Sequence, residues 1–511
     1  MRGGLAVVFV VAACVLSLAL RLPFLSVPLT GDEAGYAYVA SWLGRGPALY
    51  RDLWFDRPQG IFLLYGAILA LFGESGEAIR LAAGLYNVFT VVLIFVAGSH
   101  LSGTRAGVVA AFLFAISSAS PGIEGFTANG ELFMNLPTLA AVLLALHYRW
   151  FAAGCLLAIA TLVKPTALLA LIAALIAVAA IDRDRSTTRA LHALVRTAAG
   201  AALVTIPFVV HGMLSGPDDF WYAIVGFRAE EHSAFAAGTR FFDELRQSGP
   251  HVTWAVLPVW FLVALWLRRG RWRSPHGVVL LSFLGGTIAG AALGGYWYWH
   301  YFVGILPPAA LIAGEALVLD LLPGVAGAMR RRAAVIRAHL RRPRLPEPAP
   351  LLHLARPRLN LPWATAGLLA AAISVVANTS FVGATPDETG LRLYRRHASP
   401  ATRDIARYLE ARTHPDDTVY AAFAGPEVYF SSRRRSASRY LYWTEINRVP
   451  GALDAVIATL DDPRRCPKYI VRLQGELEQP GRAAPFWERV EQRFYPEIII
   501  SGVILYRRLN D

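Results

Sequence analysis

Residues 26–42 read SVPLTGDEAGYAYVASW, and they place two adjacent carboxylates, Asp32 and Glu33, directly after the apolar run 5–24. A run of about 20 apolar residues is long enough to cross a bilayer as a helix. The acidic pair therefore follows a first crossing at once. Its meaning depends on which side of the membrane it faces.

Composition decides the class of protein. Of 511 residues, 55% are hydrophobic and only 17% are charged, and the mean hydropathy is +0.43. Soluble domains carry about a quarter charged residues, so this chain is expected to be an integral membrane protein. The net charge of +13 lies mostly in short segments between apolar runs. Basic residues there set membrane orientation, so we expect no nucleic-acid partner.

Further apolar runs predict a polytopic, α-helical bundle. Two of them, 60–73 and 150–163, are shorter than the usual range of about 17 to 25 residues. Runs of spanning length lie at 80–99, 105–121, 131–147, 165–181, 194–214, 251–267, 276–295, 301–322 and 362–383.

Basic segments indicate the sides of the membrane. Segment 329–360 contains nine arginines and one acidic residue, and 182–189 and 268–274 are also basic, so all three are expected in the cytoplasm. Counting crossings back from these segments, the N-terminus and all basic segments lie in the cytoplasm only if 150–163 crosses the membrane and 60–73 does not. We therefore expect about 11 spanning helices. The run 61–72 is predicted to be a juxtamembrane helix at the outer surface.

This topology places the acidic pair outside the cell, and the C-terminal part with it. Residues 1–385 form the predicted membrane domain. Residues 386–511 alternate helical and β-branched stretches, which predicts a small extracytoplasmic α/β domain that caps the outer face. The other features expected on the outer side are Glu124, Glu131, the loop 215–250 and the aromatic stretch 294–302.

The outward set of residues fits the transfer of a sugar from a polyprenyl phosphate. That reaction needs a base for the acceptor hydroxyl and groups that hold the leaving phosphate. A carboxylate at the membrane surface suits the first task. Arg57, Lys164 and His300, each beside an apolar segment, suit the second.

The stretch 29–73, LTGDEAGYAYVASWLGRGPALYRDLWFDRPQGIFLLYGAILALFG, resembles the first outer loop of the glycosyltransferase C superfamily. The resemblance is to bacterial enzymes related to dolichyl-phosphate-mannose protein mannosyltransferases and to the aminoarabinose transferases of lipid A. In that family an Asp-Glu pair follows the first span, a basic residue and proline precede a juxtamembrane helix, and a second acid follows in the next outer loop. The matching residues are Asp32, Glu33, Arg57-Pro58, and Glu131 in ANGELF.

Two later stretches extend the resemblance over most of the chain. WHYFVGILPPAALIAG at 299–314 looks like the family's late aromatic-Pro-Pro helix, and PEVYFSSRRRSASRYL at 426–441 resembles its C-terminal domain. One departure is Arg57-Pro58-Gln59, where the family commonly has Lys-Pro-Pro. A planar guanidinium binds phosphate differently from an ammonium.

The resemblance implies a glycosyltransferase on the outer face of a bacterial plasma membrane, with a polyprenyl-phosphate sugar donor. It leaves open the sugar, and whether the acceptor is a glycan, a lipid or a protein. A divalent ion such as Mg²⁺ or Mn²⁺ is compatible with the paired carboxylates but is not implied. The expected catalytic residues are Asp32, Glu33 and Glu131, and the expected donor phosphate-binding residues are Arg57, Lys164, His300 and Tyr301.

Other functions and plainer roles stay open. A glycan ligase or polymerase is the alternative enzyme. A transporter or lipid flippase would be expected to show repeated halves and mid-span charges, which the sequence lacks. Asp32 and Glu33 also fit a helix N-terminus, and Glu131 fits another. Lys164 fits an interfacial lysine, and His300 fits an aromatic belt.

Overall fold

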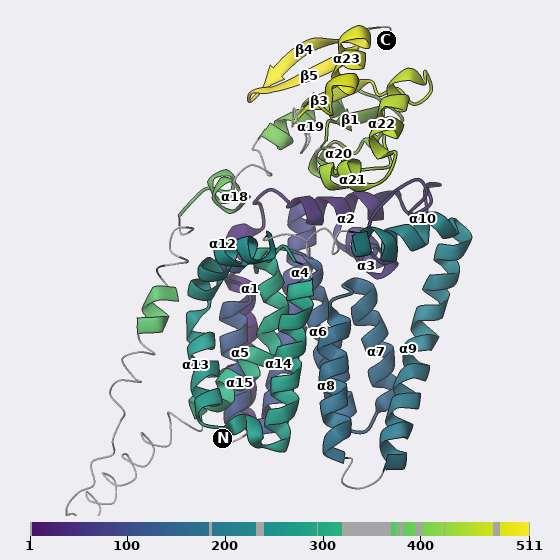
Figure 1. Ribbon diagram of the computed structural model, residues 1–511. Helices are drawn as coiled ribbons and strands as arrows, with labels where there is room; N and C mark the ends of the chain where they lie inside the picture. The colour runs from purple at the N-terminus through teal and green to yellow at the C-terminus, as the bar shows by residue number, and fades with distance from the viewer. Residues whose placement is uncertain are drawn as a thin grey trace, which may run out of the picture.

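The computed structural model describes residues 3–182, 187–230, 240–293, 295–318, 401–423, 425–473 and 481–509, together with most of 369–394. A bundle of long helices carries short helices across its upper end, and a C-terminal unit with a sheet stands on top of those (Figure 1). "Upper" and "lower" refer below to this view. The N-terminus lies at the lower end.

The bundle helices lie side by side. Gly3–Phe24, Gly76–Ser102, Thr187–Ser215 and Pro275–Leu293 are long and apolar enough to cross a membrane, and other apolar helices of the described residues have 10–17 residues. The bundle consists of α1 (Gly3–Ala19), α4 (Gly76–Ser102), α5 (Thr104–Ser117), α6 (Gly130–Leu146), α7 (Trp150–Val163), α8 (Ala167–Asp182), α9 (Thr187–Ser215), α13 (Leu257–Arg268), α14 (Pro275–Leu293) and α15 (Leu306–Ala316).

The helical bundle with a C-terminal α/β unit is as predicted. Against the predicted count of about 11 spanning helices, the described residues contain four that are long and apolar enough, or five if one bent pair is a single span. The run 251–267 contains a break, because α12 (Arg240–Ala255) and α13 meet at an angle of 92°. Val256 leaves the helical conformation there, and Pro258 has no N–H to continue the ladder of α12. Parts of the predicted spans 301–322 and 362–383, and the whole basic segment 329–360, lie outside the described residues.

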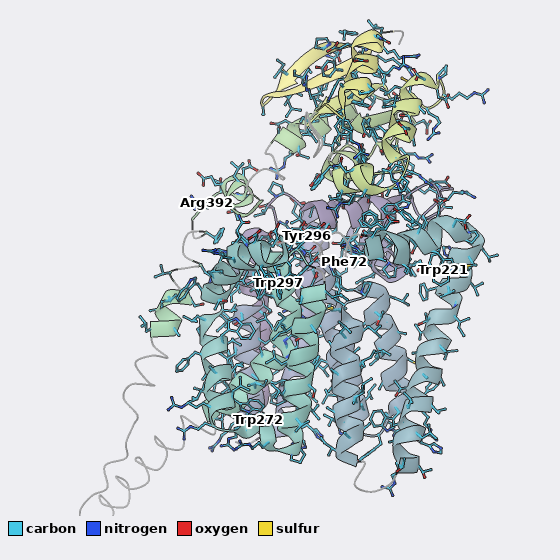
Figure 2. The ribbon with its side chains drawn as sticks, viewed as in Figure 1. Phe72, Trp221, Trp272, Tyr296, Trp297 and Arg392 are labelled. Carbon is cyan, nitrogen blue, oxygen red and sulfur yellow. The ribbon has the colours of Figure 1, made fainter. Side chains whose placement is uncertain are left out.

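Short elements cover the upper end of the bundle (Figure 1). The run predicted to lie outside the membrane forms α3 there, beside α2. Exposed tryptophans mark both ends, with Trp272 at the lower end and Trp221 at the upper end, as in membrane-interface belts (Figure 2). The short elements are η1 (Leu22–Phe24), α2 (Gly31–Trp42), α3 (Gln59–Phe72), η2 (Pro121–Ile123), α10 (Pro217–Trp221), η4 (Tyr222–Gly226) and η6 (Trp299–Ile305), with η5 (Arg271–Arg273) at the lower end and α18 (Pro386–Tyr394) leading to the C-terminal unit.

The C-terminal unit has a five-stranded sheet in the order β2-β1-β3-β5-β4. Strand β1 pairs in parallel with β2 and β3, and β5 is antiparallel to β3 and β4. The strands are β1 (Thr418–Ala421), β2 (Arg435–Ser436), β3 (Tyr469–Arg472), β4 (Phe494–Ile500) and β5 (Val503–Arg508). The helices are α19 (Ala401–Arg412), α20 (Pro426–Ser432), α21 (Trp443–Arg448), α22 (Ala452–Asp461) and α23 (Ala484–Arg493).

The C-terminal unit docks on α2. The hydroxyl of Tyr442 donates to the carbonyl oxygen of Gly31 at 2.8 Å, and the N–H of Ser436 donates to the hydroxyl of Tyr38 at 2.8 Å. Gly35 makes the fit close, since a Cβ there would lie 2.0 Å from the Tyr442 hydroxyl. The helix that carries Asp32 is therefore held between the bundle and the C-terminal unit.

Candidate functional site

The first turn of α2 is fixed by a capping box. The N–H of Glu33 donates to Thr30 Oγ1 at 3.2 Å, and the N–H of Thr30 donates to Glu33 Oε2 at 2.9 Å. This reciprocal pair satisfies two donors at the helix start. The capping role considered for the acidic pair thus falls to Thr30 and Glu33. The side chain of Asp32 has no hydrogen bond to any residue in the described ranges.

Glu33 is held in a buried ion pair that ties α2 to α4. Arg80 donates to Glu33 Oε1 through Nε at 3.2 Å and to Oε2 through Nη2 at 2.9 Å, and the N–H of Ala128 donates to Oε1 at 2.8 Å. Arg80 also donates to the carbonyl oxygens of Phe24 and Pro28, both at 2.8 Å. Burial alone would raise the pKa of Glu33, but Arg80 and the N–H donors hold it below its ordinary value.

Lys164 and Glu131 form a second buried pair. Lys164 ends α7, because the following proline cannot continue the helix, and Glu131 begins α6. Lys164 Nζ lies 2.8 Å from Glu131 Oε1 and 5.1 Å from the centre of the Tyr301 ring. Glu131 Oε2 is buried and has no hydrogen-bond partner among the described residues. The pair therefore places a fixed ammonium and a carboxylate oxygen with no hydrogen-bond partner among the described residues at the upper end of the bundle.

His300 stands between two acids. Its Nδ1 lies 2.9 Å from Glu124 Oε2, and its Nε2 lies 3.9 Å from Asp32 Oδ2, without a hydrogen bond. Burial alone would lower the pKa of His300, but the charges of Glu131, Glu124 and Asp32 raise it above its ordinary value. The contact with Glu124 orients the imidazole so that Nε2 faces Asp32. Glu124, which as a loop acid looks merely solvated in the sequence, is mostly buried.

Arg57 lies in an arginine–aspartate cluster that the sequence alone did not indicate. Its Nη1 is 2.6 Å from Asp56 Oδ2, and Arg228 contacts the same oxygen. Burial alone would lower the pKa of Arg57, but Asp56, Tyr36 and Asp32 raise it well above its ordinary value. Arg57 is therefore a permanent cation close to Asp32.

The C-terminal unit adds one further acid beside α2. A Cβ on Gly31 would lie 3.4 Å from Glu427 Oε1, so this carboxylate sits against the start of α2. Burial raises the pKa of Glu427 to about 7, with a further contribution from the charge of Asp32. The stretch 426–441 contains Glu427, but the sequence did not single it out, because its contact with α2 depends on docking between distant segments.

The structure brings the predicted site residues together, with Glu33 as the exception. Each of the acids Glu131, Glu124 and Asp56 has a basic partner within salt-bridge distance, and the described part of the chain offers Asp32 only the longer contact with His300. The cluster comprises Asp32, Arg57, Glu131, Lys164, His300 and Tyr301, and lies where α2, the start of α3, α6, the end of α7 and η6 meet.

A narrow pocket continues from the cluster into the bundle. Glu131 and Tyr301 are at its polar end, and it is otherwise lined by Met134, Thr166, Ala170, Thr287, Ala291 and Gly304 of α6, α8, α14 and η6. The described residues contain no group of three or more His, Cys, Asp or Glu side chains that fits a metal ion. Asp32 and Glu33 do not fit a shared divalent ion either, because both oxygens of Glu33 already accept hydrogen bonds.

This chain is similar in sequence and in fold to known proteins. Residues 56–211 match the family model for dolichyl-phosphate-mannose-protein mannosyltransferase. Among solved structures, ArnT from Cupriavidus metallidurans bound to undecaprenyl phosphate superposes with a TM-score of 0.65 at 16% identity, covering 100% of this chain and 99% of that one. The chain has the glycosyltransferase C fold.

Other structures share this glycosyltransferase C fold. Apo ArnT from the same organism has a TM-score of 0.62 at 17% identity, covering 98% of this chain and 97% of that one. The Archaeoglobus fulgidus oligosaccharyltransferase tethered to an acceptor peptide has a TM-score of 0.51 at 13% identity, covering 92% and 69%. No curated protein sequence matches the chain. The resemblance predicted from the sequence is confirmed.

Proposed function

We propose that this protein is a membrane glycosyltransferase that moves a sugar from a polyprenyl-phosphate donor to an acceptor hydroxyl, at the outer face of a bacterial plasma membrane. The observation that carries the proposal is Asp32, a carboxylate without a close partner among the described residues, beside Arg57 and His300. The matched family model and the polyprenyl phosphates bound by solved relatives of the same fold support the donor class.

The site residues divide the chemistry between them. Asp32 accepts the proton of the acceptor hydroxyl as the acceptor oxygen bonds to the anomeric carbon. The bond between that carbon and the phosphate oxygen breaks, and its electron pair stays on the leaving polyprenyl phosphate. Arg57, Lys164 and His300 stabilise the charge that develops there. Tyr301 positions the Lys164 ammonium through its ring face.

Glu33 and Glu131 act on other residues rather than on the sugar. Glu33, locked to Arg80, holds the start of α2 and with it Asp32. Glu131 holds the Lys164 ammonium in place. No divalent ion takes part in this scheme, because the paired carboxylates do not converge on one position.

The wider assignments belong to the same proposal. Residues 1–385 form the membrane domain, and residues 386–511 form an extracytoplasmic unit that shapes access to α2 from the acceptor side. Membrane lipids surround the bundle, and the acceptor is a glycan, a lipid or a protein. A glycan ligase or polymerase, which would transfer a preassembled glycan in place of one sugar, is the alternative.

The substitution Asp32→Asn tests the proposal. Asparagine keeps the shape of the side chain and removes the base, so we expect sugar transfer to fall by about 100 to 10,000-fold. Transfer is measured as polyprenyl phosphate released from a purified polyprenyl-phosphate monosaccharide. Mass spectrometry of the copurified lipid checks that the variant still binds donor. Normal transfer by Asp32→Asn would refute Asp32 as the base, and a protein that never copurifies with a polyprenyl phosphate would refute the donor class.

A further inference from the structure

A second pocket lies at the lower end of the molecule, far from the candidate site. It is a hollow, wide open to solvent, between the starts of α7 and α9. Its walls are Tyr148, Trp150, Thr188, Arg189, His192, Ala193 and Arg196.

Two glycines hold the walls of this pocket together. A Cβ on Gly154 would lie 2.0 Å from the carbonyl oxygen of Thr197, and one on Gly200 would lie 2.0 Å from that of Phe151. Helices α7 and α9 therefore touch backbone to backbone, which larger residues would prevent. Tyr148, with a positive φ of 59°, turns the chain just before α7. The start of α7 is thus fixed beside the first turns of α9.

The walls of this pocket carry positive charge. Arg189, His192 and Arg196 follow one another at intervals of three and four residues, so they share one face of α9. The part of the chain that the structure describes places no acidic residue in the pocket lining. Within the described residues, the side chains of Arg189 and Arg196 have no hydrogen bond or ion pair. Two guanidinium groups beside tyrosine and threonine hydroxyls form a site for an anion such as a phosphate.

The surroundings favour a lipid as the source of that phosphate. Leu191, Leu194 and Val195 of α9 have exposed fractions of 60%, 67% and 58%, next to the pocket. Helix α9 is one of the four helices long enough to span, and its apolar side chains are largely exposed along its length. In a bilayer the pocket lies at the level of the headgroups, and the apolar side of α9 lies against acyl chains.

We infer that this pocket binds the headgroup phosphate of one anionic phospholipid, whose acyl chains lie along α9. The site is independent of the proposed transferase activity, because it lies at the opposite end of the bundle and shares no residue with the candidate site. Basic pockets between membrane helices bind anionic headgroups in this way. The lipid would fix the ends of α7 and α9 relative to each other.

Native mass spectrometry of the delipidated, full-length protein tests this inference, with phosphatidylglycerol and phosphatidylcholine as probes. The double variant Arg189→Gln/Arg196→Gln keeps helix-forming side chains and removes both charges. Each arginine near an anionic headgroup contributes roughly a fivefold gain in affinity, so we expect about a 25-fold weaker binding of phosphatidylglycerol. Binding of phosphatidylcholine is expected to be weak and unchanged.

The matched control is Arg105→Gln/Arg273→Gln, which removes the same charge near the lower end, outside the pocket. We expect it to bind phosphatidylglycerol like the wild type. Equal losses in both double variants would overturn the site in favour of a general field effect, and no loss in the first would overturn it outright. If millimolar glycerol phosphate displaced the lipid, the pocket would be a site for soluble anions and the lipid assignment would be wrong.

Discussion

Asp32 differs from the carboxylates around it in what it contacts. Glu131 is paired with Lys164, and Glu124 is hydrogen-bonded to His300. Asp32 has a 30% exposed side chain, and the one basic group that the described residues bring within 4 Å of it is His300, whose Nε2 lies 3.9 Å away. A carboxylate that is not already neutralised at short range is the one that can take a proton from an incoming hydroxyl.

Lys164 provides the first prediction about the leaving phosphate. Lys164→Ala removes a buried ammonium that we place on a charge developing in the transition state, so kcat should fall by about 10 to 1,000-fold with a smaller change in KM. Lys468→Ala, which removes the chain's other lysine in the C-terminal unit, should leave kcat unchanged.

Folding must be separated from catalysis in this experiment. Lys164→Ala leaves Glu131 buried without its cation, which is itself destabilising. The double variant Lys164→Ala/Glu131→Gln removes that charge and should recover thermal stability but not kcat. Nearly wild-type turnover in the double variant would show that Lys164 has only a structural role.

The contact between His300 and Glu124 predicts a pH dependence. Burial lowers and the neighbouring acids raise the pKa of His300, with a net upward shift, so the imidazolium and its help to the leaving phosphate persist below that raised pKa and are lost as pH rises through it. Glu124→Gln removes one of these charges. The alkaline limb of kcat against pH should therefore move to lower pH. An unmoved alkaline limb would show that His300 does not titrate in the reaction.

At the scale of elements, the Glu33–Arg80 pair connects the start of α2 to α4. Both side chains are essentially inaccessible to solvent. Removing one partner of a buried pair leaves an uncompensated charge, so Arg80→Met should cost about 3 to 5 kcal/mol of stability. The double variant Glu33→Gln/Arg80→Met should be destabilised less than the sum of the single changes. Thermal unfolding in detergent measures both, and strictly additive losses would contradict the coupling.

The sequence located elements better than contacts. The apolar runs predicted most helices, and Asp32, Arg57, Glu131, Lys164 and His300 were proposed as site residues because polar residues at the ends of such runs stand out. The pair Glu33–Arg80 was missed, since its members are 47 positions apart. His300 and Glu124 are 176 positions apart. Such pairs arise from packing, and no local pattern encodes them.

The break between α12 and α13 shows the same limit within one element. Residues 251–267 are apolar throughout, and hydropathy alone does not distinguish a straight span from a bent one. The deciding feature is Pro258, two residues after Val256. The bend turns α12 across the upper end of the bundle, where it covers the loop that carries Glu124.

At the scale of the whole molecule, the C-terminal unit and the bundle meet at Gly35. Gly35→Ala places a methyl group into the Tyr442 hydroxyl and should separate the unit from α2, with loss of transfer in the assay of polyprenyl phosphate release. Gly66→Ala is the matched control, because a Cβ there meets nothing within 4 Å.

The added change Tyr442→Phe sharpens this test. Removing the hydroxyl relieves the closest part of the clash, so Gly35→Ala/Tyr442→Phe should regain part of the lost transfer. The clash with Phe55 at 3.0 Å remains, so recovery should be incomplete. If Gly35→Ala transferred sugar as well as Gly66→Ala, docking of the unit would not matter for activity.

The unequal lengths of the bundle helices have a consequence for the surrounding bilayer. Helix α9 has 29 residues, whereas α7 has 14 and α8 has 16. At 1.5 Å per residue, α7 and α8 extend only about 21 to 24 Å, less than the roughly 30 Å of a typical hydrocarbon core. Such a mismatch thins the membrane locally. A lipid phosphate beside α8 would then stand closer to the bilayer centre than elsewhere, nearer the level of Lys164.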